Sequence, residues 1–228
     1  MASFFEIGEQ RFEIGAVLWD MDGTLLDSAE YHWLAWREAL AAEGFDLTRA
    51  QFESTFGQRN DTILRTIFGP DFPSGEVDRI AGMKEARYRE LVRTRGIDAL
   101  PGVRRWLNRL KAEGWRQAVA SAAPRRNIET ILEALHIADR FDAIVSAEDV
   151  QHGKPDPQVF LLAAARLGAP PARCIVVEDA PAGVEGARRA GMCSIGVLTT
   201  HDSLRADLAV RTLDELSDDA FESLLRKT

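Results

Sequence analysis

The sequence predicts an α/β fold: a Rossmann-like parallel sheet with helices on both faces, interrupted by an inserted all-helical domain. Two observations predict this. Short apolar runs rich in β-branched residues alternate with amphipathic segments of helix length, a pattern typical of strands that are buried on both faces. In addition, one long interval between the first and second runs contains only segments with helical character.

Five short apolar runs are expected to form the strands, and helix signals lie between them. Asp156 can cap the helix that follows it, with Pro157 at its first helical position and Gly168 at its end. Pro181 opens another helix, which Gly191 ends. The expected strands are AVLWD (16–20), RQAVAS (116–121), FDAIVSA (141–147), CIVVED (174–179) and SIGVL (194–198).

The interval from about residue 28 to residue 100 shows no convincing strand. A crossover between parallel strands usually needs one helix, so several helices in a row indicate an insert. We therefore predict a cap domain over 28–100 and an α/β core formed by 1–27 and 101–228. The predicted cap helices lie in SAEYHWLAWREALAAEG (28–44), LTRAQFESTFG (47–57), RNDTILRTIFG (59–69) and EVDRIAGMKEARYRELVRTRG (76–96).

Composition excludes some classes of function. The formal charge of −8 argues against a nucleic-acid-binding protein and against binding to an anionic membrane surface. No apolar run approaches the length of about 18 residues that a membrane span needs. Cys174 and Cys193 each lie in or beside a strand-like run, which favours buried thiols in a reducing compartment. We expect a cytoplasmic protein, with a monomer as the default.

Acidic residues end two of the predicted strands. Asp20 and Asp22 follow the first apolar run with one residue between them, and Glu178 and Asp179 end the fourth. Ser121 ends the second run. Because ligands of open parallel sheets bind outside the carboxyl ends of the strands, these side chains are expected to share one site.

A divalent cation explains why such close carboxylates would be kept. Mg²⁺ prefers a few carboxylates together with phosphate oxygens of a substrate. An EF-hand loop also begins with two aspartates in this spacing, but it needs glycine where this chain has Leu25. An ordinary Asp-Gly turn would explain Asp22 and Gly23 but not Asp20 or the second acidic pair.

Lys154 lies in the sequence HGKPDP, on a loop just before a predicted helix. Taken alone, Lys154 would be a solvated surface lysine and Ser121 a helix cap before Pro124. In the order Asp20 and Asp22, Ser121, Lys154, Glu178 and Asp179, these residues form a specific set.

This set resembles the haloacid dehalogenase superfamily, in its β-phosphoglucomutase-like phosphatase branch. DMDGTLLDS resembles the first motif of the family, VASAAP the second, GKPDP the third and VVEDAPAGV the fourth, in family order. The likeness extends from about residue 16 to near the C-terminus. It implies a Rossmann-like core with a four-helix cap.

The resemblance also implies roles for the two aspartates of the first motif. Asp20 would be the nucleophile that forms an aspartyl-phosphate. Asp22 would protonate the leaving oxygen and then act as a base on the next acceptor. The dehalogenases that name the superfamily lack this second aspartate because a halide needs no proton, so Asp22 favours phosphate esters.

The other motifs would supply the metal and phosphate sites. Mg²⁺, or Mn²⁺, would bind the Asp20 side chain, the Asp22 main-chain carbonyl and Asp179, with Glu178 as a direct or water-mediated ligand. Positive charge placed in advance at the phosphoryl oxygens is a large part of phosphoryl-transfer catalysis. The residues implied for phosphate binding are Ser121, Ala122 and Lys154.

The predicted cap both resembles and departs from the β-phosphoglucomutases. His32 matches a histidine near the hinge, and Lys84 matches a lysine that holds the distal phosphate, although a solvated helix face also explains Lys84. Asn60 stands where the mutases have an arginine, with Arg59 shifted by one, and Phe56 replaces a lysine. Outside the cap, after the second motif, Ala123 and Pro124 replace a hydroxyl and a lysine.

These departures favour hydrolysis over transfer between two sugar positions. A mutase must hold a bisphosphate in two orientations and needs cations at its far end, whereas hydrolysis needs only water. The expected function is a Mg²⁺-dependent phosphatase acting on small phosphorylated metabolites, most simply sugar phosphates. The alternatives are a β-phosphoglucomutase and, from another class, a catalytically silent binding module.

Overall fold

The computed structural model describes residues 4–7, 10–13 and 15–226 and divides the chain into two compact units. The first unit comprises 1–27 and 98–228, and the second comprises 28–97. Leu26 and Ala99 form an antiparallel bridge where the two connections leave the first unit, and the amide of Leu100 donates to the carbonyl of Leu25 (2.9 Å).

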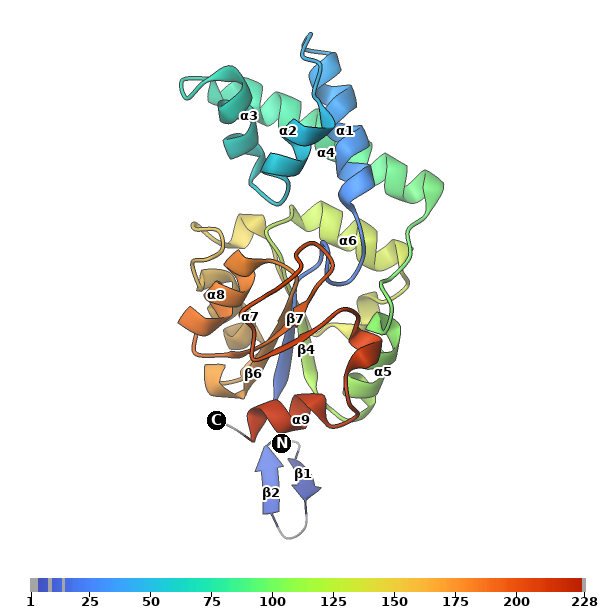
Figure 1. The fold of residues 1–228 in the computed structure, drawn as a ribbon, viewed down its shortest axis with the longest axis vertical. Helices are drawn as coiled ribbons and strands as arrows, with labels where there is room; N and C mark the ends of the chain where they lie inside the picture. Colours follow the sequence, from blue (N-terminus) through green and yellow to red (C-terminus); the bar gives the residue numbers. More distant parts are fainter. Residues whose placement is uncertain (1–3, 8–9, 14, 227–228) are drawn as a thin grey trace. The chain divides into compact units, whose positions relative to one another are not determined.

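The first unit contains a six-stranded parallel sheet in the order β5-β4-β3-β6-β7-β8 (Figure 1). The predicted α/β class is confirmed, and each of the five predicted runs corresponds to one strand, although β7 begins one residue before its run. The chain turns to opposite sides of β3 to reach β4 and β6, so the ends of these three strands form a topological switch point. The strands are β3 (Ala16–Trp19), β4 (Arg116–Ala120), β5 (Ala143–Val145), β6 (Cys174–Glu178), β7 (Cys193–Val197) and β8 (Leu208–Val210).

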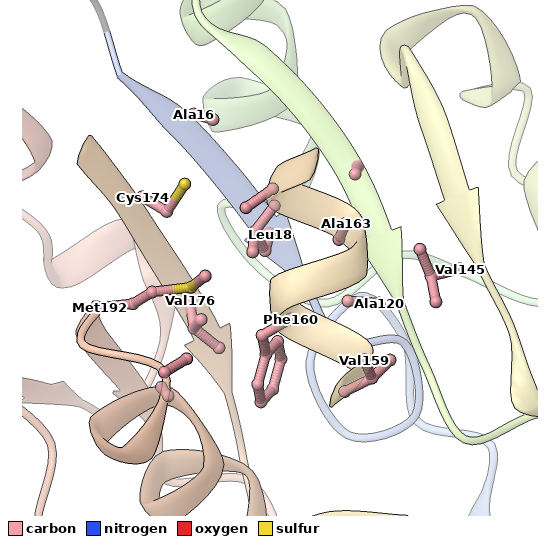
Figure 2. Close-up of a cluster of buried hydrophobic side chains, with 14 of the residues drawn as sticks. Ala16, Leu18, Ala120, Val145, Val159, Phe160, Ala163, Cys174, Val176 and Met192 are labelled. Carbon is pink, nitrogen blue, oxygen red and sulfur yellow. The ribbon is translucent and has the colours of Figure 1, made fainter. Parts of the chain in front are cut away.

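Helices cover both faces of the sheet because successive side chains of a buried strand point to opposite sides. Leu18 packs with Phe160 and Ala163 of α7, and the small side chain of Ala120 in β4 lets this helix approach closely (Figure 2). Ala118 of β4 belongs to the same buried cluster. The helices of this unit are α5 (Val103–Ala112), α6 (Arg125–Ala134), α7 (Gln158–Leu167), α8 (Pro181–Arg189) and α9 (Ala220–Leu225).

The opposite face of the sheet has an aromatic core. The ring of Trp19 lies 6.3 Å from that of Phe221 of α9, which lies 4.9 Å from the ring of Trp106 of α5. The indole of Trp19 donates to the side chain of Gln117 (3.0 Å), which satisfies its only polar atom inside this core. Strand β3 is therefore buried on both faces, as its continuous apolar run predicts.

The second unit consists of four helices, as the pattern of the insert predicts. Its apolar core includes Trp36, Leu40, Phe52 and Leu64. None of the helices in the described part of the chain is long and apolar enough to cross a membrane. The helices are α1 (Ala29–Ala41), α2 (Arg49–Thr55), α3 (Asn60–Phe68) and α4 (Ser74–Arg95).

Several details differ from the sequence-based expectations. Helix α7 begins at Gln158, one residue later than predicted, although the Asp156 carboxylate does accept a hydrogen bond from the Gln158 amide (2.9 Å). Strand β8 was not predicted, and neither was the antiparallel hairpin of β1 (Phe4–Ile7) and β2 (Gln10–Glu13). Cys174 and Cys193 are not joined by a disulfide, and only Cys174 is buried, because Cys193 lies at the more open start of β7.

Candidate active site

The carboxyl ends of β3, β4 and β6 bring the motif residues to one edge of the sheet. Trp19 lies level with Val119 of β4 and Val177 of β6, so the three strands end together. The Asp20 amide continues the β3–β6 ladder by donating to the carbonyl of Val177 (3.0 Å). This register explains why acids that are far apart in the sequence lie together in space.

Lys154 lies between two of these acids. Its ammonium group is 2.5 Å from Oδ1 of Asp20 and 2.5 Å from Oε1 of Glu178. One carboxylate oxygen each of Asp20, Glu178 and Asp179 lie within 4.8 Å of one another. The side chains of Lys154 and Asp20 are only 11% and 10% exposed, and that of Glu178 is 1% exposed. Lys154 is thus not a solvated surface lysine.

Burial and crowding change the proton affinities of this cluster. Burial raises the pKa of Asp20 well above 3.8; Lys154 opposes this shift, and the neighbouring acids add to it. Burial also raises the pKa of Asp179 to about 7, with Glu178 contributing to the rise. Burial lowers the pKa of Lys154, but the charges of Asp20 and Glu178 outweigh it and raise that pKa overall. Lys154 therefore stays protonated.

This charge balance fits a divalent cation. When ionised, Asp20, Glu178 and Asp179 carry three negative charges, and Lys154 supplies one positive charge. Oxygen ligands of this kind suit hard cations such as Mg²⁺ and Mn²⁺. The cluster could also hold the oxygens of a phosphoryl group beside a carboxylate nucleophile.

Asp22 and Gly23 form a tight loop beside the cluster. Asp22 is half-buried, and its charge contributes to the raised pKa of Asp179. Gly23 has a φ of +80°, and a Cβ built on it would lie 2.1 Å from Oδ2 of Asp179. The Asp-Gly pair thus serves two purposes: a left-handed turn and a close approach to an acid.

We expect Gly23→Ala to lower the free energy of unfolding by at least about 3 kcal/mol, because left-handed strain adds to steric overlap with Asp179. Gly191→Ala is the matched control. Gly191 has a φ of +71° in the same unit, but nothing lies within 4 Å of the position that a Cβ would take there. The control should lose only about 1 kcal/mol. Equal losses in urea denaturation would contradict the steric explanation.

Glu178 is held by the loop that follows β6. Its Oε2 accepts a hydrogen bond from the amide of Ala180 (2.8 Å), while Oε1 faces Lys154. A Cβ on Gly183 would lie 1.8 Å from Oε1 of Glu178, so only glycine leaves room for this carboxylate.

Ser121 is 2% exposed at the end of β4, and its Oγ accepts a hydrogen bond from the amide of Ala123 (3.1 Å). Ala122 lies between Ser121 and Ala123, on the same turn.

Thr200 and His201 belong to the same site, although the sequence reasoning did not single them out. The Thr200 hydroxyl donates to Oδ2 of Asp179 (2.6 Å), and Nδ1 of His201 lies 3.2 Å from the Asp179 carbonyl oxygen. Both residues follow β7, which ends at the same edge as β3 and β6. The sequence therefore did contain a signal for these two site residues, because they are polar residues that follow another predicted strand.

Three of the four predicted cap residues, His32, Asn60 and Lys84, lie close together inside the second unit. The Lys84 ammonium lies 2.7 Å from Oε1 of Glu85, and the Asn60 amide donates to the same oxygen (2.8 Å). Lys84 is 2% exposed, so its interpretation as a solvated helix face is wrong. The ring of His32 stacks on that of Tyr88 at a centroid distance of 4.1 Å.

Arg59 lies at the surface of the second unit, whereas Phe56 borders this group of cap residues, with its ring 5.9 Å from that of His32. Nε of Arg59 pairs with Oδ1 of Asp61 (3.2 Å), and the Arg59 side chain is 48% exposed. The ring of Phe56 lies 5.3 Å from that of Phe52 and packs against the apolar core. At these two positions the structure thus has a surface ion pair and a half-buried aromatic ring.

Comparison with known proteins agrees with this geometry. Residues 14–191 match a family model described as haloacid dehalogenase-like hydrolase. The chain is 37% identical to the β-phosphoglucomutase of Bacillus subtilis over 208 residues, which cover 89% of this chain and 91% of the relative. It is 34% identical to hexitol phosphatase B of Escherichia coli over 216 residues, which cover 90% and 95%.

A solved structure shows the same fold. The crystal structure of β-phosphoglucomutase from Clostridium difficile superposes with a TM-score of 0.81 at 30% identity, covering 94% of this chain and 98% of that one. The motifs in family order, the parallel sheet with its inserted helices, and these relatives agree. The chain belongs to the haloacid dehalogenase-like hydrolases, in their β-phosphoglucomutase-like branch.

Proposed function

We propose that this protein is a Mg²⁺-dependent phosphatase that hydrolyses small phosphorylated metabolites, sugar phosphates in particular, through an aspartyl-phosphate. The observation that carries the proposal is the buried Asp20 carboxylate, which lies beside Lys154 and two further acids. The similarity to hexitol phosphatase B supports the substrate class.

The reaction would take two steps. An oxygen of Asp20 attacks phosphorus, the bond to the ester oxygen breaks, and Asp22 gives that oxygen its proton. Asp22 then takes a proton from water, whose oxygen attacks the aspartyl-phosphate, releasing phosphate and restoring Asp20. Ser121, Ala122 and Lys154 would hold the phosphoryl oxygens in both steps.

The residues that would hold Mg²⁺ are the side chains of Asp20 and Asp179, the main-chain carbonyl of Asp22, and Glu178 directly or through water. When bound, Mg²⁺ would neutralise charge on the phosphoryl oxygens. Thr200 would orient Asp179 from behind, as the partners of metal ligands usually do.

The contacts of Lys84 and Asn60 within the second unit support hydrolysis over mutase activity. We propose that His32, Arg59, Asn60 and Lys84 include the cap's contacts with substrate. A second phosphate would have to compete with Glu85, which already neutralises Lys84 at 2.7 Å and accepts from Asn60. Burial disfavours the ionised form of Glu85, but the charge of Lys84 helps to outweigh it and lowers the pKa of Glu85, so this carboxylate stays ionised.

One incubation tests the reaction class. The protein receives Mg²⁺, β-glucose 1-phosphate and a trace of glucose 1,6-bisphosphate, and free phosphate and glucose 6-phosphate are followed together. Free phosphate without the isomer supports a phosphatase. The isomer without free phosphate identifies a mutase instead. If neither product forms, a panel of other phosphate esters follows, and failure on the whole panel favours the silent binding module.

We expect Mg²⁺ to raise the melting temperature more at pH 8 than at pH 5.5. Folding raises the pKa of Asp179 from 3.8 to about 7, so the metal-free folded protein holds this proton more tightly than the unfolded chain. Its stability therefore falls as the pH rises from about 4 to about 7. Over the same interval Mg²⁺ must displace the proton, and its affinity should rise by up to about tenfold per pH unit.

Thermal melts with and without Mg²⁺ at several pH values measure this effect. Asp179→Asn is the comparison, because it removes this titrating group and should reduce the pH dependence of the Mg²⁺ effect, leaving the part that Asp20 contributes. A Mg²⁺-induced rise in melting temperature that is the same from pH 5.5 to pH 8 would contradict proton competition at this carboxylate.

A further inference from the structure

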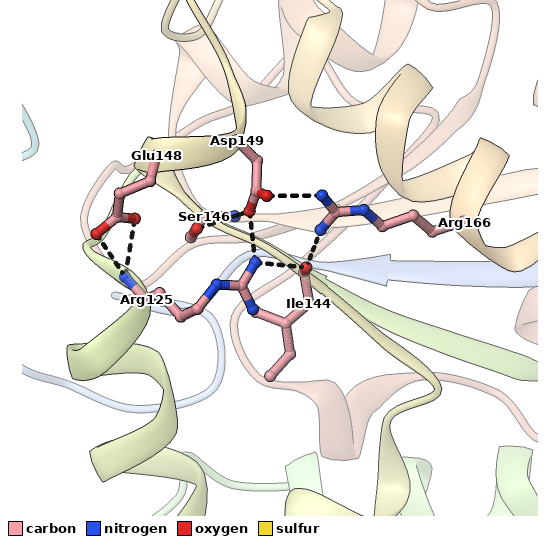
Figure 3. Close-up of polar contacts among 6 residues, drawn as sticks. All are labelled: Arg125, Ile144, Ser146, Glu148, Asp149 and Arg166. Carbon is pink, nitrogen blue, oxygen red and sulfur yellow. Dashed lines mark hydrogen bonds and ion pairs between the residues drawn. The ribbon is translucent and has the colours of Figure 1, made fainter.

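Asp149 is the centre of a polar network near the end of β5 (Figure 3). Its Oδ2 accepts hydrogen bonds from Nη2 of Arg125 (2.6 Å) and from the amide and hydroxyl of Ser146 (2.8 and 2.7 Å). Its Oδ1 accepts from Nη2 of Arg166 (2.6 Å). The Asp149 side chain is 17% exposed, so these contacts are partly shielded from water.

Both arginines make a second contact within the network. The guanidinium groups of Arg125 and Arg166 each donate to the carbonyl oxygen of Ile144 in β5. The hydrogen bond from Arg166, above all, holds the pKa of Asp149 below its usual range. A carboxylate that satisfies two guanidinium groups in this way stays ionised and has little freedom to move.

The network joins the turn that carries Ser121 to β5. Arg125 is the first residue of α6, immediately after the turn. Its amide donates to the Glu148 carboxylate (3.0 Å), and the Ala147 amide donates to the carbonyl of Ala123 (3.0 Å). The Ser121 amide itself donates to the carbonyl of Val145 (3.1 Å). The position of the turn therefore depends on residues 145–149.

The same network anchors the loop that carries Lys154. This loop leaves the short 3₁₀ helix Ala147–Asp149 directly after Asp149 and ends at α7, which holds Arg166. At its α7 end, the Gln158 side chain accepts from the amides of Gln151 (2.8 Å) and His152 (3.1 Å). Asp149 thus ties the beginning of the loop to the helix at its end.

We propose that Asp149 is a positioning residue that holds the Ser121 turn and the Lys154 loop in register, so that both meet the same phosphoryl group. This inference rests on the proposed phosphatase function. The two loops follow different strands, and catalytic groups must be placed within a fraction of an ångström. Asp149 binds one arginine from the helix after each loop, and the contacts described for the two guanidinium groups are with Asp149 and the Ile144 carbonyl.

Asp149→Asn tests this role because it keeps the shape of the side chain but removes the charge that both arginines share. We expect kcat for p-nitrophenyl phosphate to fall about tenfold to a hundredfold with little change in KM, because Lys154 acts mainly on charge that develops during the reaction. An unchanged kcat, together with a lower melting temperature, would reduce Asp149 to a structural role.

Asp207→Asn is the matched control. Asp207 also accepts hydrogen bonds from the amide and hydroxyl of one serine, Ser194 (2.7 and 3.1 Å), but at the start of β7, away from the carboxyl ends of the strands. This control should keep the wild-type kcat even if it melts at a lower temperature. If it loses as much kcat as Asp149→Asn, the effect is general and the proposal fails.

A spectroscopic measurement separates this proposal from the proposed function. Beryllium trifluoride with Mg²⁺ mimics a phosphoryl group on a carboxylate, and its three fluorines report the donors around them by ¹⁹F NMR. In Asp149→Asn we expect changed fluorine shifts and weaker binding, with wild-type spectra in Asp207→Asn. If the wild type binds beryllium trifluoride and Asp149→Asn binds it equally well with the same fluorine shifts, the positioning role is wrong but the proposed nucleophile stands. No binding by the wild type overturns the proposed nucleophile and this inference with it.

Discussion

Asp20→Asn should lower the rate of phosphate release by at least about 10⁴-fold, the largest effect that we expect from a single substitution. An amide is not a nucleophile towards phosphorus, and asparagine has nearly the shape of aspartate. The fold should persist, because burial and the neighbouring acids already disfavour the ionised form of Asp20. The melting temperature of the metal-free variant should equal or exceed that of the wild type.

Initial rates with p-nitrophenyl phosphate and Mg²⁺ measure this loss, and circular dichroism melts confirm folding. Thr199→Val is a suitable control, because Thr199 is an exposed residue beside Thr200 and has no role in the proposed reaction. Activity that survives Asp20→Asn, in protein whose mass confirms the asparagine, would exclude Asp20 as the nucleophile.

Lys154→Met should have two large effects. It removes the cation that would hold the phosphoryl oxygens, so kcat should fall about 10²-fold to 10³-fold. It also leaves Asp20 and Glu178, both 2.5 Å from the lost ammonium, without their partner. The free energy of unfolding of the metal-free protein should fall by about 3 kcal/mol at pH 8. This loss should shrink at lower pH, where Asp20, whose pKa is raised by burial, can take up a proton.

Denaturation at pH 8 and pH 5.5 tests the electrostatic part of this prediction. Adding Asp20→Asn to Lys154→Met should recover part of the lost stability, since it removes one of the uncompensated charges. Lys111→Met is the control: Lys111 is exposed and donates to the carbonyl of Asp139, so the change should stay within about 0.5 kcal/mol. A stability loss for Lys154→Met that is independent of pH would contradict the charge argument.

The strands and the order of the motifs could be predicted because their signals are local. A strand such as β3, buried on both faces, must be apolar throughout, and the aspartates that follow it mark its carboxyl end. The four helices of the insert could be predicted for the same reason, since each has its own helical spacing of apolar residues. These features also predicted that Asp20, Ser121 and Glu178 would share one edge of the sheet.

Short or dependent elements escaped prediction because their stability comes from a partner. Strand β8 has three residues and exists through its pairing with β7, and the β1–β2 hairpin likewise pairs with itself rather than with the sheet. No pattern within either segment is long enough to mark it as a strand.

The sequence by itself determined the fold class, the inserted helices and the motif residues of the candidate site, though not Thr200 or His201, because periodicity and strand ends are written along the chain. Only the tertiary structure decided how those residues are paired. The contact of Lys154 with Asp20, the support of Asp179 by Thr200 and the bridge from Asp149 to two helices join distant segments. The neutralisation of Lys84 by Glu85 joins neighbours, yet it depends on the burial of both side chains. In each case the deciding quantities are register, burial and distance in space, and these exist only once the chain has folded.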